Sequence, residues 1–203
     1  MSPRGTVQNA AMRNQTLANI SSAALRMFSE FGYHGTTMKL IAESAGQSYG
    51  LVYHYFPSKE AVFRHLVDFA LESTIAGMHA VLSAPGTAWE KLERYSAMLV
   101  GSALTGDSSR YFLIMTQALT QAKGIEGLQR HIKARAAVFY ELLVPLVIQA
   151  QKTGEAAQGD PEALVAAYLS LVQGLALLVY QGNGLERKIT AEIMSSVLRA
   201  PRH

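Results

Sequence analysis

The sequence predicts an all-helical protein of about nine helices. Hydrophobic residues make up 49% of the 203 residues. They recur at spacings of three and four along most of the chain, which is the period of an amphipathic helix. No run of alternating β-branched residues indicates a strand, and only six prolines interrupt the helical segments. The chain is long enough to bury one large core or two smaller ones.

Composition limits the class of function. The chain has no cysteine, which excludes disulfides and thiolate metal sites and agrees with a reducing cytoplasm. No HExxH motif, Ser-x-x-Lys motif or Gly-rich phosphate loop is present, so we predict no enzyme activity, no metal site and no cofactor. The net charge is +3. Residues 1–68 carry six Lys or Arg against four Asp or Glu, so the excess leans toward the N-terminal third.

The N-terminal segment predicts an arm and then a helix. Residues 1–10 are polar and contain Pro3 and Gly5, so we expect a flexible arm. Residues 1–19 lack an apolar central region, so no signal peptide is predicted and we expect a cytoplasmic protein. Gly32 ends the first helix. Its inner face consists of five apolar residues at helical spacing, namely Leu17, Ile20, Ala24, Phe28 and Phe31.

Residues 36–60, TTMKLIAESAGQSYGLVYHYFPSKE, predict two short helices joined by a tight turn. Thr36 and Thr37 are suitable N-caps for the first helix. Gly46 ends that helix, because glycine adopts a positive φ at low cost. Pro57 stops the second helix after Phe56. Two short helices around a glycine turn form a helix-turn-helix, and the hydrogen-bond donors crowded onto the second helix favour contact with a nucleic-acid backbone.

This stretch resembles a known family. The segment GYHGTTMKLIAESAG, followed six residues later by YHYFPSKEAVF, resembles the N-terminal signature of the TetR/AcrR-type family of bacterial transcriptional regulators. The match is strongest over residues 11–67. The resemblance implies a three-helix DNA-binding domain over residues 11–60 and a C-terminal helical domain for ligand binding and dimerisation over residues 61–203. A fourth helix over residues 59–82 links the two.

The expected DNA contacts follow from the order of these residues and from the resemblance. The start of the second short helix faces the base edges in a helix-turn-helix, which points to Gln47, Ser48, Tyr49 and Gly50, with His54 one turn later. The family motif implies phosphate contacts from Tyr53, Tyr55 and Lys59, together with Thr36 or Thr37. Tyr49 departs from the family, and it either stacks on a thymine methyl or sugar or simply lies on the surface. Arg4 in the arm is either free in solution or reaches the DNA.

The remaining helices are separated by clear breaks. Residues 83–87 form the first break, and Thr87 with Glu90 forms a capping box for a fifth helix. Residues 105–108 separate the fifth helix from a sixth. A seventh helix covers residues 128–152 and contains Pro145, which should kink it. An eighth, nearly all apolar, covers residues 161–181 after the cap Asp160, and a short last helix begins near residue 190.

The last two helices predict a twofold dimer. The eighth helix is apolar nearly all round, so one of its faces needs a second partner. Two terminal helices from each of two chains would form a four-helix bundle, and we expect a homodimer on a near-palindromic operator in double-stranded DNA. Residues 163–180 have the length of a membrane span, but Ser170 and Gln173 interrupt them, so no membrane partner is predicted.

The resemblance also implies a small-molecule effector bound among the fourth to eighth helices. Aromatic, Met and Gln side chains there are the candidates, although such residues usually fill a core. They are Trp89, Tyr95, Met98, Phe112, Met115, Phe139, Tyr140, Tyr168 and Gln173. Few charges recur on these faces, which favours a mostly apolar or aromatic ligand and a repressor that this ligand releases from DNA. The alternative is a DNA-bound scaffold that recruits a protein partner without any small-molecule inducer.

Overall fold

The computed structural model describes residues 3–103, 107–182 and 184–201. Within these residues the regular elements are helices, with one isolated antiparallel bridge between Ala156 and Arg199. The chain divides into two units. The first contains Met1–Phe69 and Leu113–Leu128, and the second contains Ala70–Phe112 and Gln129–His203.

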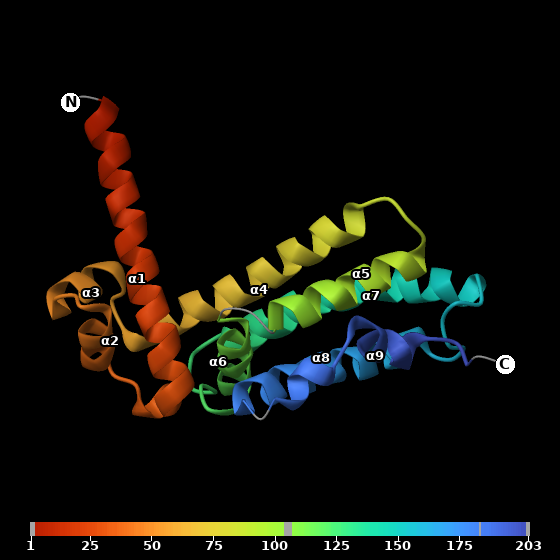
Figure 1. Cartoon of the computed structure of the whole chain (residues 1–203). Coiled ribbons are helices and arrows are strands. Elements are labelled where there is room, and N and C mark those ends of the chain that lie inside the picture. Colours follow the sequence, from red (N-terminus) through yellow and green to blue (C-terminus); the bar gives the residue numbers. More distant parts are fainter. Residues whose placement is uncertain (1–2, 104–106, 183, 202–203) are drawn as a thin grey trace. The chain divides into compact units, whose positions relative to one another are not determined.

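The first unit is built from three N-terminal helices and parts of two others. α1 (Pro3–Gly35), α2 (Met38–Ala45) and α3 (Tyr49–Tyr55) pack together in the order of the chain (Figure 1). The first part of α4 (Lys59–Ser83) and the last part of α6 (Ser108–Thr120) complete the unit. Its core contains an aromatic cluster in which the Phe63 ring lies 5.0 Å from Phe28 and 4.9 Å from Tyr33. The helix-turn-helix packs against this core through its buried residues Ile41 and Val52.

α1 differs from its prediction at both ends. It begins at Pro3, so residues 3–10 are helical, whereas a flexible arm was predicted. Proline is favoured in the first turn of a helix, and no further breaker follows Gly5 until Gly32. Gly32 interrupts the helix with φ of 70°, as predicted, although the chain resumes a helical turn to Gly35. Phe31, predicted on the inner face, is 49% exposed.

The second unit holds the longer helices. α5 (Ala88–Ala103), α7 (Leu128–Lys152) and α8 (Pro161–Gln181) join the rest of α4 and the start of α6. The chain ends in three short pieces, η1 (Leu185–Lys188), α9 (Ala191–Ser195) and η2 (Ser196–Leu198). The predicted bounds of α7 and α8 are confirmed, as are the cap at Asp160 and the start of the last helix near residue 190, where Thr190 is the N-cap. Asn183, expected in the turn after α8, lies outside the described residues.

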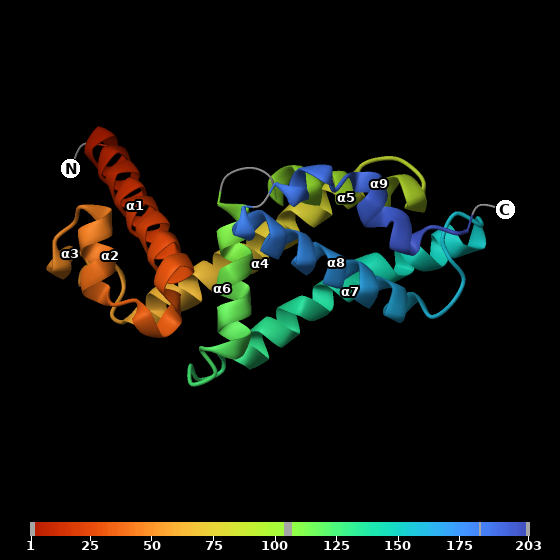
Figure 2. The ribbon, with the colours of Figure 1, turned by 60° about the horizontal axis from the view of Figure 1, so that its bottom comes forward.

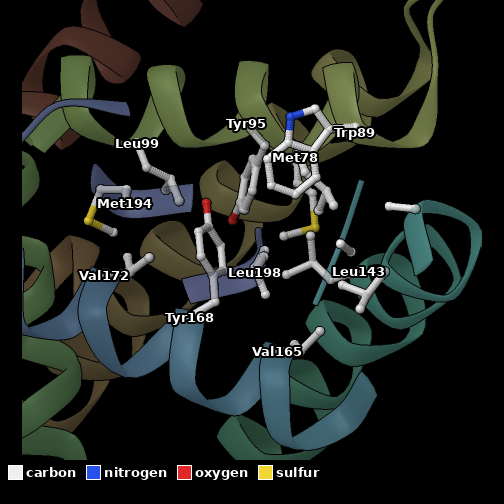
Figure 3. Close-up of a cluster of buried hydrophobic side chains, with 14 of the residues drawn as sticks. Met78, Trp89, Tyr95, Leu99, Leu143, Val165, Tyr168, Val172, Met194 and Leu198 are labelled. Atoms are coloured by element: carbon white, nitrogen blue, oxygen red, sulfur yellow. The ribbon is translucent and has the colours of Figure 1, made fainter. Parts of the chain in front are cut away.

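The core of the second unit joins α5, α8 and α9. Figure 2 shows α9 beside α5, which agrees with the contacts between those two helices. Tyr95 from α5 and Tyr168 from α8 point toward each other within this core, with Met78 and Leu198 beside them (Figure 3). Length and composition would allow α8 to cross a membrane. Its buried residues, among them Val165 and Tyr168, instead pack into this core.

The predicted pairing of two terminal helices needs a correction. α9 has five residues, and its Met194 and Ser195 are buried within the chain's own core. Backbone hydrogen bonds tie the following residues to the loop after α7, since Ala157 N–H donates to Leu198 O at 2.8 Å and Ala200 N–H to Glu155 O at 3.0 Å. The last helix is therefore short and packs within its own chain, whereas a helix of a four-helix bundle between two chains was predicted. α8 keeps three large apolar side chains exposed, namely Leu171, Leu177 and Tyr180, whereas α9 keeps Ile193 exposed.

Candidate nucleic-acid interface

The helix-turn-helix is fixed by two side-chain caps and one glycine. Thr37 Oγ1 accepts from Leu40 N–H at 3.2 Å at the start of α2, and Ser48 Oγ accepts from Leu51 N–H at 3.2 Å at the start of α3. Gly46 lies between the helices with φ of 62° and ψ of 32°, the left-handed conformation that glycine favours. Gly46 and Gln47 donate their N–H groups back to the end of α2. The two helices are therefore locked in a single short turn.

α3 places most of the predicted base-reading residues on the surface. Ser48, Tyr49, Gly50 and His54 are exposed, and Gln47 is half-buried. Val52 on the same helix is fully buried and anchors it to the core. A Cβ at Gly50 would meet no atom within 4 Å, so the backbone there is open to close approach by a ligand. Four of these five predicted residues thus lie at the start of α3, and His54 lies near its end.

Two exposed tyrosines one turn apart form a pair on α3. Tyr49 OH donates to Tyr53 OH at 3.1 Å, and the ring centroids lie 4.7 Å apart. This hydrogen bond raises the pKa of Tyr53, with slight desolvation and the nearby Glu60 acting in the same direction. A phenol is protonated at neutral pH even at its ordinary pKa, so the Tyr53 hydroxyl is available as a donor.

Tyr55 and α1 are linked at the far end of α3. The half-buried Tyr55 donates its hydroxyl to the carbonyl oxygen of Arg13 at 3.4 Å. Arg13 itself is exposed. Tyr55, predicted to bind phosphate, thus also connects α3 to the N-terminal half of α1.

Lys59 is half-buried and already has an internal partner. Its Nζ donates to Tyr33 O at 2.9 Å and lies 4.5 Å from the centroid of the Tyr33 ring. An ammonium group has three N–H donors, so two remain for an external acceptor such as phosphate. The Tyr33 hydroxyl donates to Glu60 at 3.0 Å. Burial, together with this hydrogen bond, raises the pKa of Tyr33 to about 12.

Thr36 was predicted with Thr37 as a phosphate contact, and the structure corrects this prediction. It is completely buried, and its hydroxyl lies 2.8 Å from Gly32 O and 3.0 Å from Met27 O, where it acts as donor. A hydroxyl with one hydrogen, buried against two carbonyls, has nothing left to donate to DNA. Of the two threonines named from the sequence, only the exposed Thr37 lies at the positive end of α2.

Sequence reasoning missed the residues that brace this domain from α6. Gln117 Nε2 donates to Phe28 O at 2.8 Å, and Gln121 Oε1 accepts from Tyr33 N–H at 3.4 Å. His34 Nε2 lies 3.0 Å from Gln121 O, and a Cβ at Gly32 would come within 3.1 Å of Gln121 Oε1. These partners lie nearly ninety positions apart in the chain. The sequence carries no local signal for them.

The predicted effector residues separate into three groups. Trp89, Tyr95 and Tyr168 are buried in the core of the second unit. Four others are half-buried against that core, namely Met98, Phe112, Phe139 and Tyr140. Two predictions need correction: Met115 belongs to the first unit, and Gln173 is exposed on α8 because it falls on the helix face opposite Tyr168 and Val172.

The polar side chains inside this core differ in their hydrogen bonding. Ser96 Oγ donates to Leu92 O at 2.9 Å and lies 2.8 Å from the Tyr168 hydroxyl, so Tyr168 is the donor in that second bond. The Tyr95 hydroxyl has no hydrogen-bond partner among the described residues, although Tyr95 is only 1% exposed. Burial raises the pKa of Tyr95 far above its ordinary value.

A surface depression of about 260 Å³ lies beside Trp89 and Arg199, with Gly154 and Glu155 on its rim. There the Arg199 guanidinium lies 4.8 Å from the Trp89 ring and pairs with Glu93. The described residues also contain no group of acidic or His side chains that could hold a metal ion.

Comparisons with known proteins agree with this geometry. Residues 20–66 match the family described as "Bacterial regulatory proteins, tetR family". The HTH-type transcriptional regulator RutR of Escherichia coli (strain K12) is 38% identical over 81 residues, which are 38% of this chain and 38% of RutR. The matched segment thus spans less than half of the length of RutR.

Solved structures share the fold of the whole chain. The MbdR regulator from Azoarcus sp. CIB has a TM-score of 0.76 at 21% identity, covering 93% of this chain and 100% of that one. A putative transcriptional regulator from Saccharomonospora viridis, solved in complex with choline, has a TM-score of 0.70 at 21% identity and covers 90% of this chain and 93% of that one. At these identities the likeness shows a common fold.

Proposed function

We propose, from the membership of this chain in the tetR family of bacterial regulatory proteins, that it is a cytoplasmic repressor which a small molecule releases from a near-palindromic DNA operator. The observation that carries the proposal is the row of exposed polar side chains on α3, held by the Ser48 cap and anchored by Val52. Repression needs no additional surface, because a protein seated on an operator can exclude other proteins from that DNA.

The contacts divide into two kinds. Gln47, Ser48, Tyr49 and Gly50 open α3 and would meet base edges in the major groove, with His54 one turn further on. Thr37 at the start of α2, together with Tyr53, Tyr55 and Lys59, would hold the phosphate backbone. In a twofold dimer, two copies of α3 would enter successive major grooves about 34 Å apart. A ligand would release the DNA by favouring a different spacing.

Two substitutions test the site assignment. Lys59→Ala should weaken binding to operator DNA and to random DNA about equally, by roughly fivefold. It should also reduce the slope of log affinity against log salt concentration by about one. Gln47→Ala should change sequence preference, because a base-edge contact discriminates by about 1–3 kcal/mol. Binding is measured on a selected operator duplex and a random duplex at several salt concentrations.

The controls separate binding from stability. Lys133→Ala removes an equal charge from an exposed site on α7 and should bind like the parent. Urea unfolding of Lys59→Ala reveals any cost of losing the Tyr33 contact. If Lys59→Ala and Gln47→Ala both bind the two duplexes like the parent, the assignment is wrong.

The effector would be a small, mostly apolar or aromatic molecule with one hydrogen-bond acceptor. Support comes from the Tyr95 hydroxyl, which is buried among apolar and aromatic side chains in the second unit. Tyr95→Phe preserves the ring and removes the hydroxyl. It should weaken the response to an effector about tenfold and leave operator affinity without effector unchanged. The measurement is operator release across a panel of aromatic and aliphatic compounds, with parent and variant side by side.

The scaffold alternative has its own support in the filled core. The depression beside Trp89 is shallow and open, and the buried side chains of the second unit pack closely around Tyr95 and Tyr168. A protein that recruits a partner needs no internal cavity. If a broad panel of compounds leaves operator binding unchanged in the parent protein, the scaffold becomes the better description.

A further inference from the structure

The pair of tyrosines on α3 is an unusual feature of the helix-turn-helix. Tyr49 is 53% exposed and Tyr53 is 39% exposed, so two large aromatic side chains stand on a helix of seven residues without cover from the described residues. They are four positions apart, the spacing at which side chains on a helix meet. Their rings lie 4.7 Å apart at an interplanar angle of 57°. The two side chains thus form one unit.

A count of donors and acceptors shows what this unit can offer. A phenol has one O–H hydrogen and accepts on the same oxygen. Tyr49 gives its hydrogen to Tyr53 at 3.1 Å. The pair is left with one free O–H hydrogen, and it belongs to Tyr53. Because Tyr53 already accepts a hydrogen bond, its own O–H is polarised and its direction is restricted.

We propose that Tyr49 is a positioning residue, which donates to the Tyr53 hydroxyl and thereby aims the Tyr53 O–H at a phosphate oxygen of bound DNA. The proposal rests on the proposed function, since it assumes that α3 binds DNA. It assigns Tyr49 to the phosphate contact, although Tyr49 lies at the start of α3 among the residues expected to read base edges.

The assignment makes two distinctive demands. Tyr49 should contribute equally to every DNA sequence, because a phosphate carries no sequence information. The contribution of Tyr49 should also vanish when Tyr53 has no hydroxyl, because Tyr49 acts only through it. A Tyr49 that touches a thymine methyl directly would meet neither demand, and a Tyr49 that touches a sugar directly would fail the second.

A double-mutant cycle tests both demands. Tyr49→Phe, Tyr53→Phe and the double variant retain both rings and remove one or both hydroxyls. Their affinities are measured by fluorescence anisotropy on a selected operator duplex and on a random duplex. Tyr53→Phe should weaken both duplexes about tenfold, and Tyr49→Phe should weaken both about threefold. The double variant should bind like Tyr53→Phe alone, because the loss at position 49 is already contained in the loss at position 53.

Two further readouts separate positioning from a merely structural role. The phenols are uncharged, so the salt dependence of binding should stay that of the parent in all three variants. Urea unfolding should show parent-like stability, because the pair lies on the surface. Tyr111→Phe removes a tyrosine hydroxyl from α6 and serves as the matched control, with parent-like binding expected.

Several outcomes would overturn the inference. Additive losses in the double variant would show that the two hydroxyls act independently. A loss at Tyr49→Phe confined to the operator would make Tyr49 a base-reading residue, and parent-like binding by Tyr49→Phe would remove its role. Failure of the proposed function would give results that differ from all of these. In that case, Lys59→Ala and Gln47→Ala would also bind like the parent, or the parent would bind no duplex at all.

Discussion

At the scale of single residues, two neighbouring threonines have opposite roles. Thr36 is completely buried and donates to the carbonyls of Gly32 and Met27, which closes the turn between α1 and α2. Thr37 is exposed and caps α2. The choice between them depends on which hydroxyl meets the end of α1. That contact is nine positions away for Thr36.

Thr36→Val should therefore affect stability, while DNA affinity stays unchanged. Valine has nearly the shape of threonine but leaves both carbonyls without their hydroxyl donor, which should lower the free energy of unfolding by about 1–2 kcal/mol. Urea unfolding followed by circular dichroism measures this change. Thr37→Val is the matched comparison, since it should weaken DNA binding at temperatures where both variants are folded. A Thr36→Val protein as stable as the parent would contradict the assigned role.

Residue types and local spacing were enough to find most of the candidate site. Gly46 has the left-handed conformation that its sequence position predicted. Lys59 was named from the family motif, but its contact with Tyr33 was not foreseeable, because the two residues meet only after α1 has packed on α4. Tertiary partners, rather than residue types, decide how such side chains divide their hydrogen bonds.

At the scale of elements, α4 contains a histidine whose protonation opposes folding. His65 packs against Phe56 with ring centroids 5.2 Å apart, and burial lowers the pKa of His65 below its ordinary value of 6.5, although Asp68 acts in the opposite direction. The unfolded chain then takes up a proton before the folded chain does. Stability is therefore greatest above pH 6.5 and declines as the pH falls through 6.5 and the lowered folded-state value.

His65→Gln should remove this part of the pH dependence. Between pH 7.5 and pH 5.5 the parent should lose more unfolding free energy than the variant does. The difference is measured by urea unfolding at both pH values. His79→Gln, at an exposed site on the same helix, is the control and should follow the parent. Equal pH dependence in the parent and His65→Gln would contradict the role given to burial.

Helix bounds were predictable wherever strong end signals exist. α8 begins after Asp160 with Pro161 and ends at Gly182, whose φ is 65°, and each of these signals is local. α1 was predicted too short, because its first residues lack apolar periodicity even though nothing stops the helix there. α9 was predicted as a bundle helix, but its contact with α5 depends on the fold of the second unit. Local rules therefore fail where only distant contacts set the length or role of a helix.

At the scale of the whole molecule, α8 presents an apolar face that its own chain leaves exposed. Leu171 is 43% exposed, Leu177 is 51% exposed and Tyr180 is 45% exposed. The exposed Ala167 and Gly174 lie on the same helix and would let a second helix approach closely. An exposed apolar patch of this kind is typical of an interface, and we propose that a second copy of α8 covers it by twofold symmetry.

Leu171→Glu combined with Leu177→Glu should convert a dimer into a monomer. Charges on both copies of the face would repel, and operator affinity should fall at least tenfold because one chain holds only half of the operator contacts. Sedimentation velocity gives the mass, and circular dichroism checks that the helices remain. Ile193→Glu is the informative control. Ile193 is 49% exposed on α9, and a dimer that survives this change would agree with a minor role for the last helix.

The division of the chain into two units was only partly predictable. The predicted boundary followed residue 60, whereas the first unit extends to Phe69 and also takes in Leu113–Leu128. Gln117 and Gln121 hold that later segment to α1 through hydrogen bonds to backbone groups of Phe28 and Tyr33. The amino-acid composition of a segment does not reveal that it packs into an earlier domain. Only the folded chain shows into which unit it packs.

The position of Trp89 has a practical consequence. It is the only tryptophan of the chain, it is 6% exposed, and the guanidinium of Arg199 lies over its ring. Indole emission responds to the polarity and charge around the ring, so the tryptophan fluorescence of this protein, excited at wavelengths that tyrosine does not absorb, reports on the second unit alone. Compound screening can therefore proceed without dyes or labels. A molecule that enters the core near Tyr95, or one that displaces the C-terminal residues around Arg199, would change the wavelength or the intensity of the tryptophan emission.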